Sequence, residues 1–192
     1  VTACTEKEGL YLVELDQTVF FPEGGGQLSD KGKIADVIVS HVSEKDGHIY
    51  HECDKPLEVG AEVKAVLDWR VRLDRMQQHL GEHLLSYACW KLFKANNIGF
   101  HMNEDDVFID LDKELTEEEL LKAELYTNEI IWENRPVHIS YMDSTEAVKL
   151  KDKMRKFNSK LTGILRIVSV EDADICTCCG TPPPFTGMLG SV

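Results

Sequence analysis

Short alternating runs of apolar and polar residues fill the first third of the chain, and turn residues separate them. The pattern predicts β-strands at residues 10–15, 18–21, 33–42, 48–51 and 62–69. Asp46-Gly47 is the clearest hairpin turn, because both residues suit the left-handed backbone of tight hairpins. Strands at this spacing are typical of a small barrel, so we expect an N-terminal β-barrel over residues 1–69.

Helical spacing begins after Asp68-Trp69-Arg70 and continues to about residue 94. The apolar positions there form one stripe, made of Leu73, Met76, Leu80, Leu84, Tyr87 and Ala88. Further along, the pattern predicts a strand at 106–111, a helix from a Thr116 capping box to about Asn134, a strand at 137–142, a short helix at 144–150 capped by Asp143 or Ser144, and a strand at 163–170. Residues 70–192 are therefore expected to form an α+β domain in which helices pack on an antiparallel sheet.

Composition narrows the class of protein. With 192 residues and 43% hydrophobic content, the chain is long enough to bury a proper core. The formal net charge of -13 argues against indiscriminate coating of nucleic acid, which depends on neutralising phosphates, so a nucleic-acid contact is expected to be local. Six cysteines, in a chain with neither a signal-like run nor an apolar span of membrane length, favour a reducing cytoplasm and no membrane.

Two histidines lie four residues apart within the predicted helix. His79 and His83 would share one helix face, where they could hold a single ion between them. Zinc takes N, S or O ligands, and Cys176, Cys178 and Cys179 offer thiolates near the end of the sequence. Two imidazoles and one thiolate would leave a position for water. The alternative is a pair of helix-surface histidines.

A glycine-rich stretch contains Gly24, Gly25 and Gly26, followed directly by Gln27. Consecutive glycines allow backbone geometries and close approaches that other residues forbid. This property suits a segment that contacts a ligand through its backbone. A flexible hairpin loop is the alternative.

Basic residues interrupt the acidic chain near its end. They are Lys149, Lys151, Lys153, Arg155, Lys156 and Lys160, with only Asp152 among them. Their net charge of +5 leaves -18 on the rest of the chain. Such a concentration suits a local phosphate contact, and a solvated surface is the alternative. Arg72 and Arg75 precede His79 on its own helix face, so cations and metal site would share one surface.

Four motifs follow one another along the chain. They are Phe21-Pro22-Glu23-Gly24-Gly25-Gly26-Gln27, Asp68-Trp69-Arg70 with Arg72, His79-Leu80-Gly81-Glu82-His83-Leu84-Leu85-Ser86, and Cys178-Cys179-Gly180-Thr181. In this order they resemble the alanyl-tRNA editing proteins of the AlaX family and the editing domain of alanyl-tRNA synthetase. The resemblance spans nearly the whole chain.

The resemblance implies a barrel that carries the glycine-rich motif, joined to a zinc-binding editing domain that hydrolyses tRNA(Ala) wrongly charged with serine or glycine. It implies His79, His83 and Cys178 as zinc ligands and places Gly24, Gly25, Gly26 and Gln27 near the substrate. The family's fourth ligand falls at Pro182, whose side chain cannot bind a metal. Water, substrate or Cys176 would then fill the fourth position.

Gln27 and Glu82 are the catalytic candidates. Glu82 directly precedes His83, unlike the glutamate of the helical metalloprotease motif, so a role beside the metal ligands competes with a structural or solvent-facing one. The candidates for tRNA contact are Arg70, Arg72, Arg75, Lys153, Arg155 and Lys156.

We therefore expect a zinc-dependent aminoacyl-tRNA hydrolase of the cytoplasm that edits mischarged tRNA(Ala) in trans and without ATP. The alternative is a non-catalytic tRNA-binding module, or a degenerate or fragmentary editing domain, with a structural zinc site. Pro182 favours the alternative, whereas the retained histidine pair, Cys178 and the glycine motif favour the enzyme.

Overall fold

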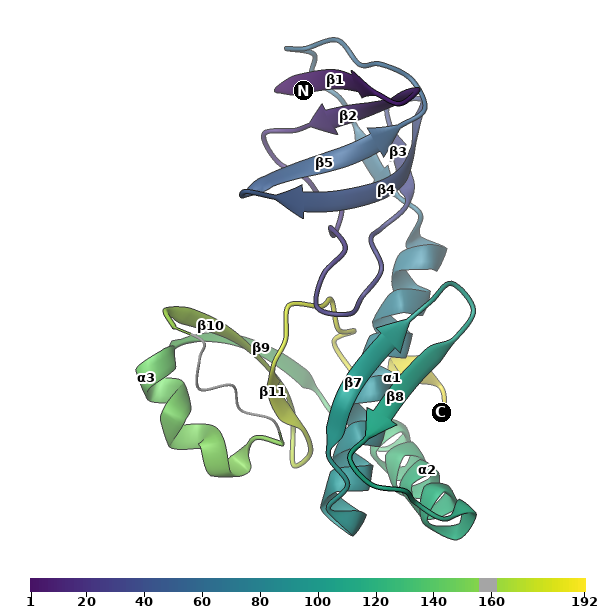
Figure 1. Cartoon of the computed structure of the whole chain (residues 1–192), viewed down its shortest axis with the longest axis vertical. Coiled ribbons are helices and arrows are strands. Elements are labelled where there is room, and N and C mark those ends of the chain that lie inside the picture. Colours follow the sequence, from purple (N-terminus) through teal and green to yellow (C-terminus); the bar gives the residue numbers. More distant parts are fainter. Residues whose placement is uncertain (156–161) are drawn as a thin grey trace. The chain divides into compact units, whose positions relative to one another are not determined.

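The structure, a computed structural model, describes residues 1–155 and 162–192 (Figure 1). Its contacts divide the chain into two compact units, Val1–Arg75 and Met76–Val192. Antiparallel sheets and helices make the fold α+β, as the sequence predicts. Within the described residues, no helix combines the length and the apolar character that crossing a membrane requires.

Six strands form one antiparallel sheet in the Val1–Arg75 unit. They are β1 (Ala3–Lys7), β2 (Leu10–Glu14), β3 (Gly32–Ile34), β4 (Val37–Lys45), β5 (His48–Cys53) and β6 (Ala65–Leu67). Their spatial order is β1-β2-β5-β4-β3-β6, and no ladder joins the edge strands β1 and β6 among the described residues. The closed barrel predicted for this part of the chain is therefore not confirmed.

Alternation along the strands buries one face of this sheet. In β4, Val37, Val39 and Val42 are 3%, 1% and 0% exposed, while Ile38 between the first two is half exposed. A bulge between Val39 and His41 shifts the register of β4 against β5, which explains why the buried positions are not evenly spaced. These valines form one core with Val13 and Ile34.

Two strand predictions in this unit are corrected. Residues 18–21 form no strand, because the Thr18 hydroxyl accepts from the Phe20 amide at 3.1 Å and contacts His51 Nε2 at 2.8 Å, which replaces ladder hydrogen bonds. The predicted strand at 33–42 is two strands, β3 and β4, because the chain turns at Ala35, where φ is 54°. The Asp46-Gly47 hairpin is confirmed, with φ of 53° and 80°.

The second unit combines helices with two small antiparallel sheets. Its elements, the first of which begins before the unit boundary, are α1 (Trp69–Phe93), β7 (Asn97–Met102), β8 (Val107–Leu111), α2 (Glu117–Trp132), β9 (Val137–Asp143), α3 (Ser144–Ala147), η1 (Val148–Lys153), β10 (Ile164–Val170), β11 (Ile175–Thr177) and η2 (Thr186–Leu189). Strands β11, β10 and β9 form an antiparallel sheet with β10 in the centre, and β7 and β8 form a separate hairpin (Figure 1).

The apolar stripe of α1 packs against α2. Leu80, Leu84 and Tyr87 form a buried cluster with Ile130 and Ile131, as the helical spacing predicts. Helix α2 begins at the predicted capping box: the Thr116 hydroxyl accepts from the Glu119 amide at 3.2 Å, and the Glu119 carboxylate accepts from the Thr116 amide at 2.9 Å. Helix α2 therefore packs along the apolar side of α1.

Candidate metal centre

Helix α1 buries polar residues beside its apolar stripe. His79, Glu82 and His83 are only 4%, 6% and 5% exposed, and Ser86 is fully buried. The surface-histidine alternative is therefore wrong for this helix. Burial of polar groups costs free energy unless they have partners, so the contacts of these side chains define what the helix face can do.

Strand β11 supplies the partners. Because successive side chains of a strand point to opposite faces, Asp174, Cys176 and Cys178 lie on one face of β11 and its flanks. Asp174 and Cys176 are 1% and 5% exposed, while Ile175 and Thr177, which alternate with them, are only partly buried. Asp174 was not among the residues predicted for the site. Its signal was the Asp-x-Cys-x-Cys alternation, which has the period of a strand.

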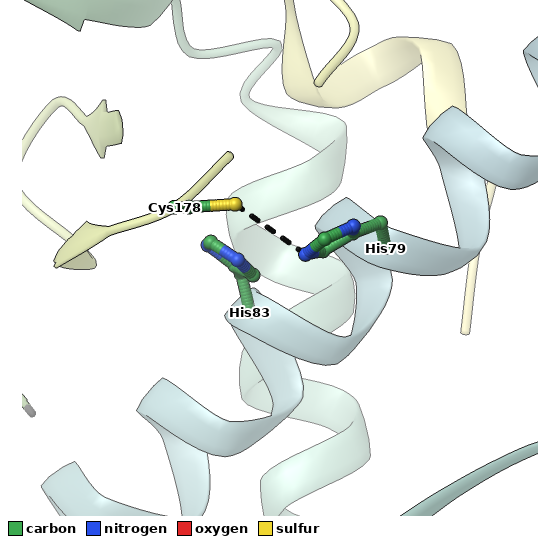
Figure 2. Close-up of side chains that lie close together, drawn as sticks. All are labelled: His79, His83 and Cys178. Carbon is green, nitrogen blue, oxygen red and sulfur yellow. Dashed lines mark hydrogen bonds between the residues drawn. The ribbon is translucent and has the colours of Figure 1, made fainter. Parts of the chain in front are cut away.

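Figure 2 shows His79 and His83 on α1 with Cys178 reaching towards them from the chain after β11. The ligand atoms of the three residues all lie within 4.8 Å of one another, a group that could hold a metal ion. Cys178 Sγ is 3.4 Å from His79 Nε2, and the centroids of the two imidazole rings are 5.1 Å apart. The structure thus brings together three residues that the sequence separates by up to about a hundred positions.

A second group shares His83. Asp174 Oδ2 lies 3.4 Å from His83 Nδ1, and Cys176 Sγ lies 3.3 Å from the same nitrogen. These three residues also satisfy the geometry of a possible metal group. Cys176 therefore belongs with Asp174 at the Nδ1 edge of His83, and not to the group that contains His79 and Cys178.

Charge in this region favours a cation. Burial alone would raise the pKa of the Cys178 thiol, but hydrogen bonds from His79 and His83 lower it to about 5, so that sulfur is a thiolate at neutral pH. Burial likewise opposes a charge on His83, yet Cys176 and Asp174 raise its pKa well above the usual value. Surroundings that favour a proton on His83 also favour a metal cation in its place.

Pro182 lies beside the predicted ligands. It lines a small cavity together with His79, His83 and Cys178, and Gly180 closes the same space. The Gly180 amide donates to Cys178 Sγ at 3.2 Å, which fixes the turn between the cysteine and the proline. A proline ring has no donor atom, so it contributes shape but no ligand at this position.

Glu82 is held by hydrogen bonds inside the unit. Its Oε1 accepts from the Ser86 hydroxyl at 2.7 Å and from the Asn97 amide group at 2.6 Å. Its Oε2 lies 3.8 Å from His83 Nε2. The solvent-facing role considered for Glu82 is therefore wrong, and its proposed part in catalysis stays a prediction.

The glycine motif forms a tight turn in the N-terminal unit. Gly24 and Gln27 exchange two backbone hydrogen bonds of 3.1 and 3.0 Å. Gly25 and Gly26 between them have φ of 60° and 83°, where a side chain would be strained. Gln27 is fully buried. The substrate contacts expected of this turn stay a prediction.

The cations expected to contact tRNA differ in their surroundings. Arg70 and Lys153 are exposed, whereas Arg75 is 4% exposed. The Arg72 guanidinium donates to the buried Asp30 carboxylate and, at 2.9 Å, to the Val19 carbonyl. Arg155 is buried in an ion pair with Asp174. Lys156 and Lys160 lie outside the described residues.

Comparison with known proteins gives consistent matches. A family model described as class II (A) tRNA synthetases matches residues 1–71. The alanyl-tRNA editing protein AlaX-L of Pyrococcus horikoshii is 36% identical over 97% of this chain and 48% of its own length. The alanyl-tRNA editing protein Aarsd1 of Bos taurus is 33% identical over 89% of this chain and 39% of its own. An alanine–tRNA ligase of Thermococcus kodakarensis is 33% identical over 94% of this chain and 21% of its own. The chain thus spans about half, or less, of the length of these relatives.

Proposed function

Because the chain is related to the alanyl-tRNA editing proteins over nearly its whole length, we propose that it removes wrongly attached amino acids from tRNA(Ala). The proposed substrate is chiefly tRNA(Ala) charged with serine, and secondarily with glycine. The observation that carries the proposal is the convergence of His79, His83 and Cys178 within 4.8 Å in the second unit. Three donors this close together can hold a metal ion, and such an ion would polarise the carbonyl of an ester.

We propose zinc as the ion held by these three residues. Two imidazoles and one thiolate are ligands that zinc prefers in a tetrahedral site. The donor set fits, since Cys178 is already ionised at neutral pH and the region around His83 favours positive charge. Zinc at this position would supply a Lewis acid for the ester.

The side chains around the ligands determine what else occupies this position. Pro182 presents no donor atom, and Cys176 lies at the Nδ1 edge of His83 with Asp174. Three protein ligands therefore leave room for a fourth, from water or from the substrate, as in catalytic zinc sites. An aminoacyl ester is already activated, so orientation within such a pocket is the main requirement.

The remaining parts of the proposal concern substrate binding. The Gly24–Gln27 turn presents two positive-φ glycines, where a ligand can approach the backbone closely, and we assign substrate contact to it. Arg70 and Lys153 are the exposed cations that suit phosphate contact. Glu82, which Ser86 and Asn97 hold with its Oε2 3.8 Å from His83 Nε2, is assigned a role beside the metal ligands.

Release of serine from mischarged tRNA tests the proposal. The purified chain is expected to contain zinc and to deacylate Ser-tRNA(Ala) faster than Ala-tRNA(Ala), and a chelator should abolish the difference. A serine hydroxyl offers hydrogen bonds that alanine lacks, and a polar pocket distinguishes on that basis. Equal rates for both tRNAs would contradict editing. Zinc binding and tRNA binding without hydrolysis would instead favour the non-catalytic module, to which the substitution at Pro182 points.

A further inference from the structure

Arg155 is buried, whereas the basic residues just before it in the sequence are exposed. Its side chain is 6% exposed, and its guanidinium lies 3.2 Å and 3.5 Å from the two carboxylate oxygens of Asp174. Its Nη2 is also 3.9 Å from Glu82 Oε1. A buried guanidinium costs free energy unless it is paired, and here two carboxylates pair with it.

Both carboxylates adjoin the same imidazole. Asp174 Oδ2 lies 3.4 Å from His83 Nδ1, and Glu82 Oε2 lies 3.8 Å from His83 Nε2. The three charged groups come from different elements: Glu82 from α1, Asp174 from the residue before β11, and Arg155 from the chain after η1. One guanidinium therefore ties together the two acids that flank His83.

We propose that Arg155 and Asp174 are positioning residues that orient the His83 imidazole for metal binding, an inference that rests on the proposed zinc site. A metal-binding histidine commonly donates its second ring N–H to a carboxylate, which fixes the tautomer and the plane of the ring. In this arrangement Asp174, 3.4 Å from Nδ1, would accept the Nδ1 proton, which would leave Nε2 as the nitrogen for the metal. Arg155 in turn fixes the Asp174 carboxylate through both of its oxygens.

The arrangement also argues against a metal at the second possible group, which contains Asp174 and Cys176. A guanidinium already neutralises Asp174, and the group offers no histidine other than His83. Stability alone gives no reason to keep such a network, because apolar residues of similar volume often stabilise an interior as well as or better than a buried ion pair. Orientation of a metal ligand gives that reason.

The test of the inference is to measure the zinc affinity of two variants, Asp174→Asn and Arg155→Lys, by chelator competition. Asp174→Asn keeps the shape but removes the charge, and Arg155→Lys keeps the charge but loses the planar fork. We expect Asp174→Asn to weaken zinc binding about 10- to 100-fold, the usual effect of losing a partner of a metal-binding histidine, and Arg155→Lys to weaken it less. The absorption spectrum of the cobalt-substituted protein should change in both variants.

Asp30→Asn is the matched control. Asp30 is a fully buried aspartate paired with an arginine, Arg72, but it belongs to the other unit. Its substitution should lower the free energy of unfolding and leave zinc affinity and the cobalt spectrum unchanged. If the Asp174 and Arg155 variants behave in the same way, the network is purely structural and the inference is overturned, while the proposed function stands. If the unaltered chain binds no zinc, both are overturned.

Discussion

Cys178 is the residue on which the candidate metal centre depends most, because it is the member that does not come from α1. Its sulfur lies 3.4 Å from His79 Nε2, and its pKa of about 5 makes it a ready ligand at neutral pH. Cys179, the next residue, is exposed. Of these two adjacent cysteines, only Cys178 belongs to the candidate metal group.

Cys178→Ser is expected to abolish tight zinc binding. A serine hydroxyl is not ionised near pH 7, so it is a poor ligand for zinc. Loss of a partner that only positions a ligand lowers zinc affinity by up to about 100-fold, and loss of the ligand itself should lower it further. Bound zinc is measured after dialysis against a chelator of known affinity. Cys179→Ser removes a neighbouring exposed thiol and should retain zinc. Retention by both variants would show that Cys178 is not a ligand.

Pro182→His is expected to raise zinc affinity by at least about tenfold, because an imidazole would replace a ring without donor atoms in a cavity that His79, His83 and Cys178 already line. Chelator competition measures the gain, and deacylation of Ser-tRNA(Ala) measures its effect on activity. Pro184→His, at an exposed position two residues on, is the control. Equal affinity in all three proteins would mean that position 182 does not face the metal.

Residue spacing pointed to the components of the candidate centre but not to their surroundings. His79 and His83 could be grouped because helical periodicity is local, and the crowded thiols pointed to Cys176, Cys178 and Cys179 together, whereas only the family resemblance singled out Cys178. Asp174 and Arg155 could not be assigned in the same way, because their roles arise from contacts across the β10–β11 turn and the chain after η1. Arg155 looked like one of several solvated cations, and only its burial distinguishes it.

At the scale of elements, helices with a clear apolar period or a capping motif were predicted correctly, whereas some short strands were not. Helix α1 and the capped start of α2 follow from apolar period and cap chemistry. The three-residue strand β11, which carries Cys176, is too short for hydrophobic alternation to predict it, and only the Asp-x-Cys-x-Cys spacing that extends beyond its ends has the period of a strand. Residues 18–21 have β-prone composition, yet a side-chain hydrogen bond from Thr18 holds them in a loop.

Thr116→Ala is expected to lower the free energy of unfolding by about 1 kcal/mol, because it removes the hydroxyl that accepts from the Glu119 amide at the start of α2. Helix α2 holds Ile130 and Ile131 against α1, so the loss should reach the packing beside the metal centre. Urea unfolding gives the value. Thr162→Ala, at an exposed position outside the named elements, should change it by no more than about 0.5 kcal/mol. If both variants lose the same free energy of unfolding, the Thr116 cap does not stabilise α2 in the way described.

At the scale of the whole molecule, the net negative charge limits where tRNA could bind. A net charge of -13 repels a polyanion, so binding must come from a local excess of positive charge. Lys151 and Lys153 are exposed at the end of η1, in the only basic run that the sequence shows. Because Arg155 is buried and Lys149 pairs with Glu146 at 2.7 Å, these two lysines are the described cations of that run best placed to meet phosphates.

Lys151→Gln combined with Lys153→Gln is therefore expected to weaken tRNA binding and to reduce the slope of log affinity against log salt by up to about two, one for each phosphate that is no longer neutralised. The matched control is Lys7→Gln with Lys45→Gln, which removes the same charge from exposed positions of the N-terminal unit. Both double variants carry a net charge of -15, two below the -13 of the unaltered chain, so general repulsion is equal in the two.

Filter binding at several salt concentrations measures affinity and slope together. If the two variants lose affinity equally, repulsion by the whole molecule explains the loss and the η1 lysines make no special interaction with the tRNA. If neither loses affinity, the tRNA binds elsewhere, and Arg70 is the next exposed cation to substitute.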